Sequence, residues 1–361
     1  KQHIGEQVTS KGAIHNIRDM SDFAFILVRT ARELIQCVYS PEFSDYRLTP
    51  DVVEQCTAKV TGKVVPSETR DGSERYELQI SNIEILSTPA AIPPVVISKK
   101  QVTCDLSTLL DFRPVTLRNP KERAIFKIQE GIQRGFREFL TSQNFTEVHT
   151  PKINFAGAEG GTNVFKLDYF GKTVYLAQSP QLYKQALVPV YERVFEIGPV
   201  FRAEHHDTSR HLNEYISMDF EMGYIEDFTD IMNMETGALQ YIMNLLKTEY
   251  APEVELLKVD IPEIKSIPCI RFKDAKEMCI KKLKNITDMK DFEPEEEAFL
   301  GKWAKKQYNS DFLFVTHYLS AKRPFYTMDD PEDPEVTLSF DLLFRGLEIT
   351  SGGQRIHDYN M

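Results

Sequence analysis

The sequence predicts an α+β protein with more than one domain: a small β-barrel, followed by a larger domain of antiparallel hairpins flanked by helices. Two observations lead to this prediction. Short strand-like runs separated by turns fill residues 1–98, and long amphipathic helical patterns begin only near residue 120. A chain of 361 residues, 42% of them hydrophobic, is also long enough to bury two cores.

The barrel is predicted from four apolar segments in the first hundred residues. Residues 24–40 hold two apolar runs, residues 57–65 a third around Gly62, and residues 75–86 a fourth that alternates with polar side chains. About five short strands are typical of a small barrel, and the oligonucleotide-binding barrel is its common form. Another kind of small β module is the alternative.

The composition divides the chain into three segments. Three prolines in residues 88–98 predict an extended linker, so we place the barrel at 1–98 and a hinge at 99–120. The second domain is then 121–361.

The second domain opens with an amphipathic helix from Pro120 to about residue 145 and a strand that ends at Pro151. Next we expect two strands joined at Gly171 and a helix that begins after Ser179 and Pro180. Residues 227–250 and 274–307 are predicted to be mostly helical, and the chain finishes with a hairpin.

Residues 194–224 predict a long hairpin with one polar face. Tyr215, Asp219 and Glu221 share one parity of the second arm, and Arg202 and Glu204 share one parity of the first. The opposite parity of the second arm is predicted to be core and holds Ile216, Met218, Phe220 and Met222. A solvated antiparallel face with a polar connection is the alternative interpretation.

The final hairpin turns at residues 345–346, which places Asp341 and Glu348 on one face as diagonal neighbours. Two such carboxylates repel each other unless a cation lies between them, and hard oxygen ligands select Mg²⁺. A solvated acidic pair is the alternative. Ser351 and Arg355 follow, and the guanidinium of Arg355 is suited to a bidentate grip on a carboxylate.

Composition excludes some classes of protein. The net charge of −11 argues against a protein that binds nucleic acid through a dominant basic field. No apolar run approaches the length of a membrane span, and the first residues do not form a signal peptide. Five scattered cysteines without a C-x-x-C pair favour a reducing, cytoplasmic setting.

Five motifs in order resemble those of the class II aminoacyl-tRNA synthetases. VFEIGPVFRAE with NEYISMDFEM resembles their motif 2, and GFREFLTSQNFTEVHTPKI resembles motif 1. Within that class AGAEGGTNVF, AQSPQLYKQ and EITSGGQRIHD are similar to the aspartyl-tRNA synthetases of the archaeal and eukaryotic type. The resemblance implies an enzyme that activates L-aspartate with ATP and transfers it to tRNA(Asp), with the barrel reading the anticodon.

The resemblance assigns the polar face of the long hairpin to ATP. Arg202 would hold the α-phosphate, Glu204 the adenine amino group, and Tyr215 the face of the adenine ring. Arg210 and His211 would reach the outer phosphates. Mg²⁺ would bind to Asp341, Glu348 and Ser351, and Glu348 would also contact ATP.

The resemblance implies that the aspartate site lies beside the ATP site. Asp219 and Glu159 match the carboxylates that bind the substrate ammonium, and Gln181 matches the contact to its α-carboxylate, with Ser351 nearby. Lys184 and Arg355 match the pair that clamps the side-chain carboxylate, and with Arg202 they are the predicted catalytic residues. Two cations for one anion would favour aspartate over asparagine, whose neutral amide would leave both charges unpaired.

The resemblance also implies partners. Phe25, Gln36 and Glu77 match positions that bind anticodon bases, although Phe25 as plain barrel core is the alternative. Motif 1, at residues 135–151, is implied to form the interface of a homodimer.

One departure is that the chain stops at Met361, before the motif 3 that follows QRIHD in this family. We expect the residues to belong to a longer protein. The alternatives are an enzyme that also serves tRNA(Asn), or a truncated, non-catalytic paralogue that binds tRNA.

Overall fold

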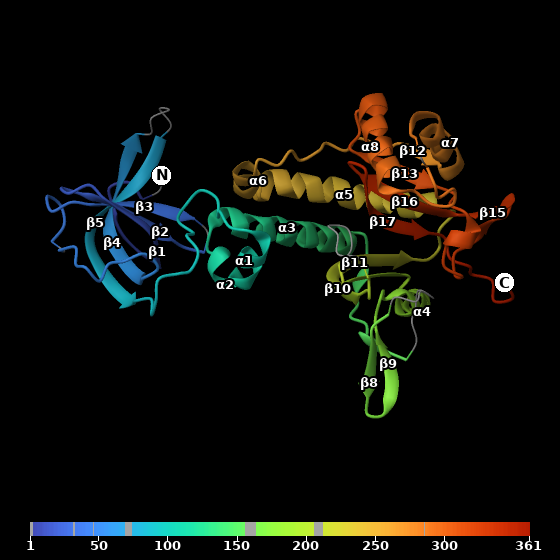
Figure 1. Ribbon diagram of the computed structural model, residues 1–361, viewed down its shortest axis with the longest axis horizontal. Helices are drawn as coiled ribbons and strands as arrows, with labels where there is room; N and C mark the ends of the chain where they lie inside the picture. Colours follow the sequence, from blue (N-terminus) through green and yellow to red (C-terminus); the bar gives the residue numbers. More distant parts are fainter. Residues whose placement is uncertain are drawn as a thin grey trace. The chain divides into compact units, whose positions relative to one another are not determined.

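The computed structural model divides the chain into two units, residues 1–125 and residues 126–361 (Figure 1). It describes residues 3–31, 33–45, 47–68, 74–155, 164–205, 212–284 and 286–361. No helix in these ranges is long and apolar enough to cross a membrane.

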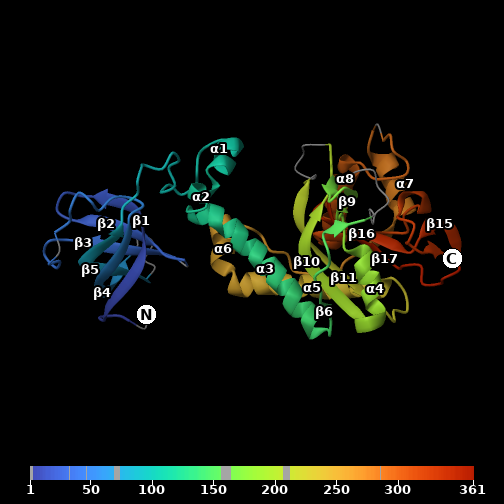
Figure 2. The same ribbon diagram turned by 90° about the horizontal axis from the view of Figure 1, so that it is seen from below.

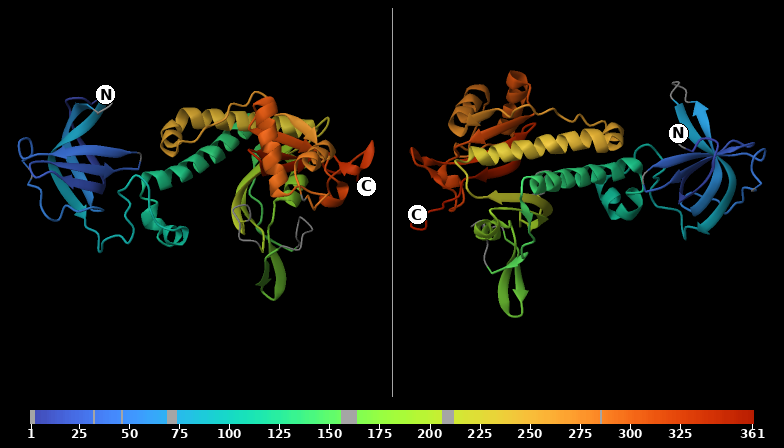
Figure 3. Two further views of the ribbon diagram at one scale, coloured as in Figure 1. Left: turned by 45° about the horizontal axis from the view of Figure 1, so that its top comes forward. Right: turned by 180° about the vertical axis from the view of Figure 1, so that it is seen from behind.

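The first unit contains the predicted barrel (Figure 3), which is closed and has the strand order β1-β2-β3-β5-β4. β3 and β5 pair in parallel and the other neighbours pair antiparallel. The strands are β1 (Gln7–Asp19), β2 (Ala24–Arg29), β3 (Leu34–Tyr39), β4 (Thr57–Glu68) and β5 (Glu74–Ser87). The polar side chains of β1 weaken its apolar alternation, so the sequence pattern does not predict this strand.

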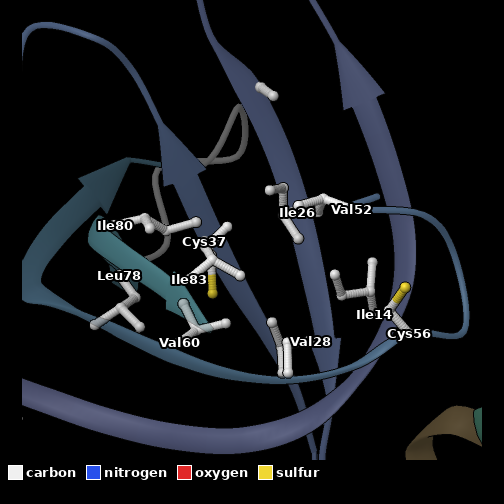
Figure 4. Packing of buried hydrophobic residues seen from close by; sticks show 12 residues of the cluster. Ile14, Ile26, Val28, Cys37, Val52, Cys56, Val60, Leu78, Ile80 and Ile83 are labelled. Carbon is white, nitrogen blue, oxygen red and sulfur yellow. The ribbon is translucent and has the colours of Figure 1, made fainter. Parts of the chain in front are cut away.

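The barrel core is aliphatic and closed to water. Ile14, Ile26, Val60 and Ile80 have no exposed surface and point toward one another inside the barrel (Figure 4). Gly62 lies where two strands approach closely, since a Cβ there would be 2.3 Å from the Gln79 carbonyl oxygen. Only glycine fits this position without a shift of the backbone.

The predicted hinge contains two short helices, α1 (Leu106–Asp111) and α2 (Arg113–Thr116). Asp105 caps α1, because its Oδ1 accepts a hydrogen bond from the Thr108 amide at 2.9 Å. Residues 88–98 contain neither helix nor strand, as their prolines predict. The domain limits at residues 98 and 120 stay predictions.

Helix α3 (Pro120–Ser142) begins in the first unit and continues into the second, where it runs beside α5 (Thr229–Glu249) (Figures 1 and 3). A Cβ on Gly135 would lie 2.9 Å from Ile242, so glycine permits the close approach of the two helices. Their apolar faces pack on β10 (Arg193–Phe201) and β11 (Glu214–Met222), which form the long hairpin. The hairpin belongs to a sheet with the order β11-β10-β6, in which β6 is Thr146–Glu147 (Figure 2).

A second sheet has the order β12-β13-β16-β17 and is covered on both faces (Figure 1). α7 (Phe272–Lys282) and α8 (Pro294–Tyr308) pack on one face, and α5 packs on the other. The strands are β12 (Cys269–Arg271), β13 (Phe312–Thr316), β16 (Ser339–Phe344) and β17 (Leu347–Gly353). Helix α5 therefore contributes to the cores behind both sheets.

The smaller elements complete the second unit. A three-stranded sheet has the order β7-β9-β8, and β14 pairs with β15. These elements are β6 (Thr146–Glu147), β7 (Ile153–Asn154), β8 (Lys166–Tyr169), β9 (Lys172–Leu176), α4 (Gln181–Tyr191), α6 (Ala251–Leu257), the 3-10 turn η1 (Ser320–Lys322), β14 (Asp329–Asp330) and β15 (Asp333–Thr337).

The structure corrects three details of the prediction for this unit. The sheets are mixed, because β6 is parallel to β10 and β12 is parallel to β13. The strand before Pro151 has only two residues, since the Thr150 amide bonds to the Glu196 carboxylate at 3.0 Å instead of a neighbouring strand. The apolar face of β11 is not all core: Ile216 and Met218 are 45% and 37% exposed, because the cluster of α3 and α5 reaches only Phe220 and Met222.

Candidate functional site

The site is built on the polar face of β11, where Ser217, Asp219 and Glu221 follow each other on one side of the strand. Glu221 is buried, and Asp219 lies opposite the buried Glu196 of β10 in the ladder. Buried carboxylates must be paired with cations or hydrogen-bond donors. The partners come from other segments of the chain.

Helix α4 supplies two of these partners from its first two turns. The Lys184 Nζ lies 3.0 Å from Asp219 Oδ1 and 3.6 Å from Glu221 Oε2. Gln181 donates from Nε2 to Glu221 Oε2 at 3.2 Å. Burial raises the pKa of Asp219, but the Lys184 charge and hydrogen bonds from Ser217 and Lys184 outweigh it, so the net pKa lies below its usual value.

Arg355, which follows β17, closes the network from the far end of the chain. Its Nε lies 3.3 Å from Glu221 Oε1, and its Nη2 donates to Gln181 Oε1 at 3.0 Å. The guanidinium also lies over the Tyr326 ring at 5.0 Å. Gln181 thus bridges Arg355 and Glu221, and two cations face two carboxylates.

The structure brings together four of the predicted site residues: Gln181, Lys184, Asp219 and Arg355. Glu221 is not among the predicted site residues, although it shares the parity of Asp219 on the same strand. That shared parity was the signal that could have identified it. Its partner Arg355 could not be deduced, because the two residues are 134 positions apart.

At the hairpin loop, Arg202 lies 6.0 Å from the centre of the Tyr215 ring. β10 ends at Phe201, so Arg202 and Glu204 lie in the connection and not along the strand as predicted. The ladder stops there because Asn213 Nδ2 donates to the carbonyl groups of both residues, at 2.9 and 3.2 Å. Three predicted site residues, Glu159, Arg210 and His211, lie outside the described residues.

The final hairpin has the predicted register, with Leu343 opposite Glu348. A bulge after Leu342 places Asp341 opposite Ser351. Burial raises the pKa of Asp341, and burial together with the Asp341 charge raises that of Glu348, although Glu348 keeps contact with solvent. The two carboxylates are therefore close enough to interact strongly.

A cation does lie beside this acidic pair, but it is a side chain that the sequence analysis did not identify. Arg323 Nη2 is 2.8 Å from Asp341 Oδ1, and the guanidinium stacks over Tyr318 at 4.0 Å. The contact between Arg323 Nη2 and Asp341 Oδ1 is an ion pair whose geometry does not suit a hydrogen bond. Within the described residues this oxygen therefore accepts none. No group of three His, Cys, Asp or Glu side chains suited to a metal occurs among the same residues.

The barrel carries the other predicted residues on its outer surface. Phe25 is half-buried and alternates with the buried Ala24 and Ile26, so it points away from the core and the alternative of plain barrel core is wrong. Gln36 donates to Glu77 Oε2 at 3.1 Å. Phe25 pairs with Val38 and Leu27 with Gln36 across β2 and β3, which makes Phe25 and Gln36 diagonal neighbours on one face.

Comparison with protein families gives two matches that together span most of the chain. The family described as tRNA synthetases class II (D, K and N) matches residues 105–361. The family described as OB-fold nucleic acid binding domain matches residues 8–86.

Curated relatives match along the whole chain. It is 45% identical over 366 residues to the aspartate-tRNA(Asp/Asn) ligase of Deinococcus radiodurans, covering 100% of this chain and 82% of the relative. Identity is 43% to the Thermus thermophilus protein of the same description, covering 99% of this chain and 82% of the relative. It is 37% to the aspartate-tRNA(Asp) ligase of Pyrococcus horikoshii, again covering 99% and 82%.

Solved structures agree with the fold. Asparaginyl-tRNA synthetase from Pyrococcus horikoshii, complexed with asparaginyl-adenylate, superposes with a TM-score of 0.87 at 28% identity, covering 99% of this chain and 82% of that one. Aspartyl-tRNA synthetase from Entamoeba histolytica gives a TM-score of 0.83 at 29% identity, covering 99% and 77%.

The network predicts that Glu221→Gln lowers the free energy of unfolding at pH 7 by about 1 to 3 kcal/mol, because Arg355 loses its carboxylate partner and Lys184 loses one of two. Urea unfolding followed by circular dichroism measures the change. Glu226→Gln, at an exposed position a few residues away, is the matched control and should leave stability unchanged. Equal stability of both variants would show that Glu221 does not hold the network.

Proposed function

The chain belongs to the class II aspartyl-tRNA synthetases, and we propose that the network around β11 binds L-aspartate while the hairpin loop binds ATP. The observation that carries this assignment is the meeting of Lys184, Arg355 and Gln181 on the carboxylates of β11. The established activity is ligation of aspartate to tRNA, so the site must neutralise a small substrate that carries three charges.

Aspartate binding is proposed to proceed by exchange of partners. In the free protein Lys184 is paired with Asp219. The substrate ammonium takes Asp219, with Glu159, and the substrate side-chain carboxylate takes the released Lys184 together with Arg355. One buried ion pair is thereby replaced by two. Asparagine lacks the second charge, so its amide would leave Lys184 with only Glu221, 3.6 Å away, as a counterion, which is the proposed basis of selectivity.

Activation needs no general base, because the substrate α-carboxylate is ionised at neutral pH. It attacks the α-phosphorus of ATP, pyrophosphate leaves, and aspartyl-adenylate forms. Arg202 is proposed to neutralise charge at the α-phosphate, where it builds up. Tyr215 supplies the stacking surface for adenine, Glu204 accepts from its amino group, and Arg210 and His211 contact the outer phosphates.

Asp341, Glu348 and Ser351 are the residues that would hold Mg²⁺, which would offset phosphate charge when bound. The mutual repulsion of the two carboxylates, which Arg323 offsets only in part through its ion pair with Asp341, supports this fit. Two protein carboxylates are the usual number for a magnesium ion that also binds substrate phosphates.

The barrel is proposed to bind the anticodon bases through Phe25, Gln36 and Glu77. The three residues share an outer face of the barrel. This supports the proposal, since barrels of this kind bind single-stranded nucleic acid on the outer surface of their β-strands. A second candidate function is aspartylation of tRNA(Asn) as well as tRNA(Asp). The names of the relatives at 45% and 43% identity favour it.

The proposal extends to a homodimer that forms through residues 135–151 in the cytoplasm. Supporting observations are the apolar side chains left exposed next to this segment, where Phe155 is 73% and Ile153 48% exposed. The five cysteines are free, as expected in a reducing compartment.

Lys184→Met in the full-length protein should lower kcat/KM for pyrophosphate exchange with L-aspartate by about 10- to 100-fold, the scale of one hydrogen bond to a charged group. Lys172→Met removes an exposed lysine of β9 and is the matched control, for which exchange should be unchanged. Exchange by the unmodified protein that is equally fast with L-asparagine or L-lysine would contradict the substrate assignment.

Gln36→Ala and Glu77→Ala should reduce aspartylation of tRNA(Asp) and leave pyrophosphate exchange nearly unchanged, because the two residues lie in a different domain from the ATP site. Charging of tRNA(Asp) and tRNA(Asn) transcripts, measured side by side, also tests the second candidate function. A parallel fall in exchange and charging would mean that the two residues have a structural role.

Sedimentation of the full-length protein at micromolar concentration should give the mass of a dimer, because an interface of the usual size persists at that concentration. A single monomeric species would contradict the proposed interface.

A further inference from the structure

Three arginines of the first unit lie close together, and two of them donate to one glutamine. Arg29 ends β2, Arg118 follows α2, and Arg123 lies in the first turn of α3. Arg29 Nη2 and Arg118 Nη1 both donate to Oε1 of Gln55, at 3.2 and 3.4 Å. Arg123 Nη1 donates to the carbonyl group of Thr30, the residue after Arg29, at 3.0 Å.

Among the described residues this cluster has no carboxylate counterion. In the described ranges none of the three guanidinium groups takes part in an ion pair, whereas the nearby Arg113 lies 3.6 Å from Glu122. Burial, and then the charges of Arg118 and Arg123, lower the pKa of Arg29 to about 10. Like charges that share one acceptor repel one another, and a bound anion would offset this repulsion.

The neighbouring histidine adds no charge at neutral pH. His15 is 2% exposed and its Nδ1 lies 3.0 Å from Arg29 Nη1, so the neutral ring accepts this hydrogen bond. Burial, and then Arg29 and Arg123, lower the pKa of His15 to about 4. The uncompensated charge therefore comes from the arginines, in a protein whose net charge is −11.

Gln55 gives an independent sign of a missing acceptor. Its side chain is 8% exposed, and its Oε1 is used by both arginines. The Nε2 is buried and, within the described residues, has no hydrogen-bond partner. A buried amide donor without an acceptor is costly. The same anionic oxygen atoms that balance the arginines would satisfy this donor.

The cluster is held in place before any ligand arrives. Asn119, which is fully buried, donates to the carbonyl groups of Ile97 and Lys99 at 2.9 and 2.8 Å. The adjacent Arg118 donates from Nε to the Pro114 carbonyl group at 3.2 Å. Arg118 is exposed, so an anion from solvent can reach its guanidinium. Pre-organised side chains lose little entropy on binding.

We propose that Arg29, Arg118, Arg123 and the amide of Gln55 form a binding site for a backbone phosphate of the tRNA. This inference rests on the proposed function, because it takes tRNA as the bound polyanion. Guanidinium groups pair with phosphate through two parallel hydrogen bonds, and phosphate contacts position a nucleic acid without reading its sequence. The site would thus hold the tRNA next to the barrel, apart from the outer face that carries Gln36.

The test compares the unmodified full-length protein with Arg118→Ala, which removes the exposed member of the cluster. tRNA affinity should fall about three- to tenfold at 0.1 M salt, and the slope of log K against log salt should decrease by about 1. The loss should be the same for transcripts with altered anticodons. Arg118→Lys should restore most of the slope, and pyrophosphate exchange with aspartate should not change.

Lys59→Ala is the matched control, because it also removes one positive charge from the first unit. The Lys59 ammonium is already paired with Glu84 at 3.1 Å, so the salt slope should hardly change. Equal slope changes in the two variants would mean that only overall charge matters and would overturn the proposal.

Two further outcomes would also overturn it. An unchanged slope with a lower melting temperature in Arg118→Ala would assign the cluster a structural role. The slope could also stay unchanged while inorganic phosphate raises the melting temperature of the unmodified protein but not of the variant. That result would assign the cluster to a free anion. Failure of the unmodified protein to exchange pyrophosphate with aspartate would instead reject the proposed function, which separates the two failures.

Discussion

The catalytic unit depends on the pairing of buried charges around β11. Asp219 and Glu221 are held on a strand that packs against α3 and α5, and they face inward only because Lys184, Gln181 and Arg355 meet them. Removing any one partner would leave a charge or a donor in a region that excludes water. The need to pair these charges therefore joins α4, the long hairpin and the segment after β17.

The two sheets of the second unit are joined through α5. This helix packs on β10 through one set of side chains and on β13 and β16 through another, so it contributes to both cores. The acidic pair of Asp341 and Glu348 lies on the second sheet. Arg323 offsets part of its charge through Asp341, which explains how two carboxylates can lie together in a folded protein.

The surfaces of the barrel differ in chemistry. Its aliphatic core is closed, its outer face carries the hydrogen-bonded pair of Gln36 and Glu77, and the arginine cluster lies where β2 meets the segment before α3. A strongly acidic chain can thus present a local positive site, because binding depends on the charges within about a Debye length and not on the total.

The sequence alone determined the elements and the chemistry of their faces. Periodicity predicted four of the five barrel strands, helix α3, the long hairpin and the final hairpin with Leu343 opposite Glu348, since each pattern is read over a few neighbouring residues. The residue types on these faces also led to predictions of residues for ATP, aspartate and a divalent cation. The family resemblance then gave these residues their roles.

Only the tertiary structure decided which charges meet and which faces are covered. The Arg355 contacts to Glu221 and Gln181 span 134 and 174 positions, and no local pattern encodes a pair at such a separation. The exposure of Ile216 depends on how far α3 and α5 extend, and the short β6 depends on a side chain that replaces a strand partner. Burial and ion pairing are set by distant segments that pack together, whereas periodicity reports only the local chain.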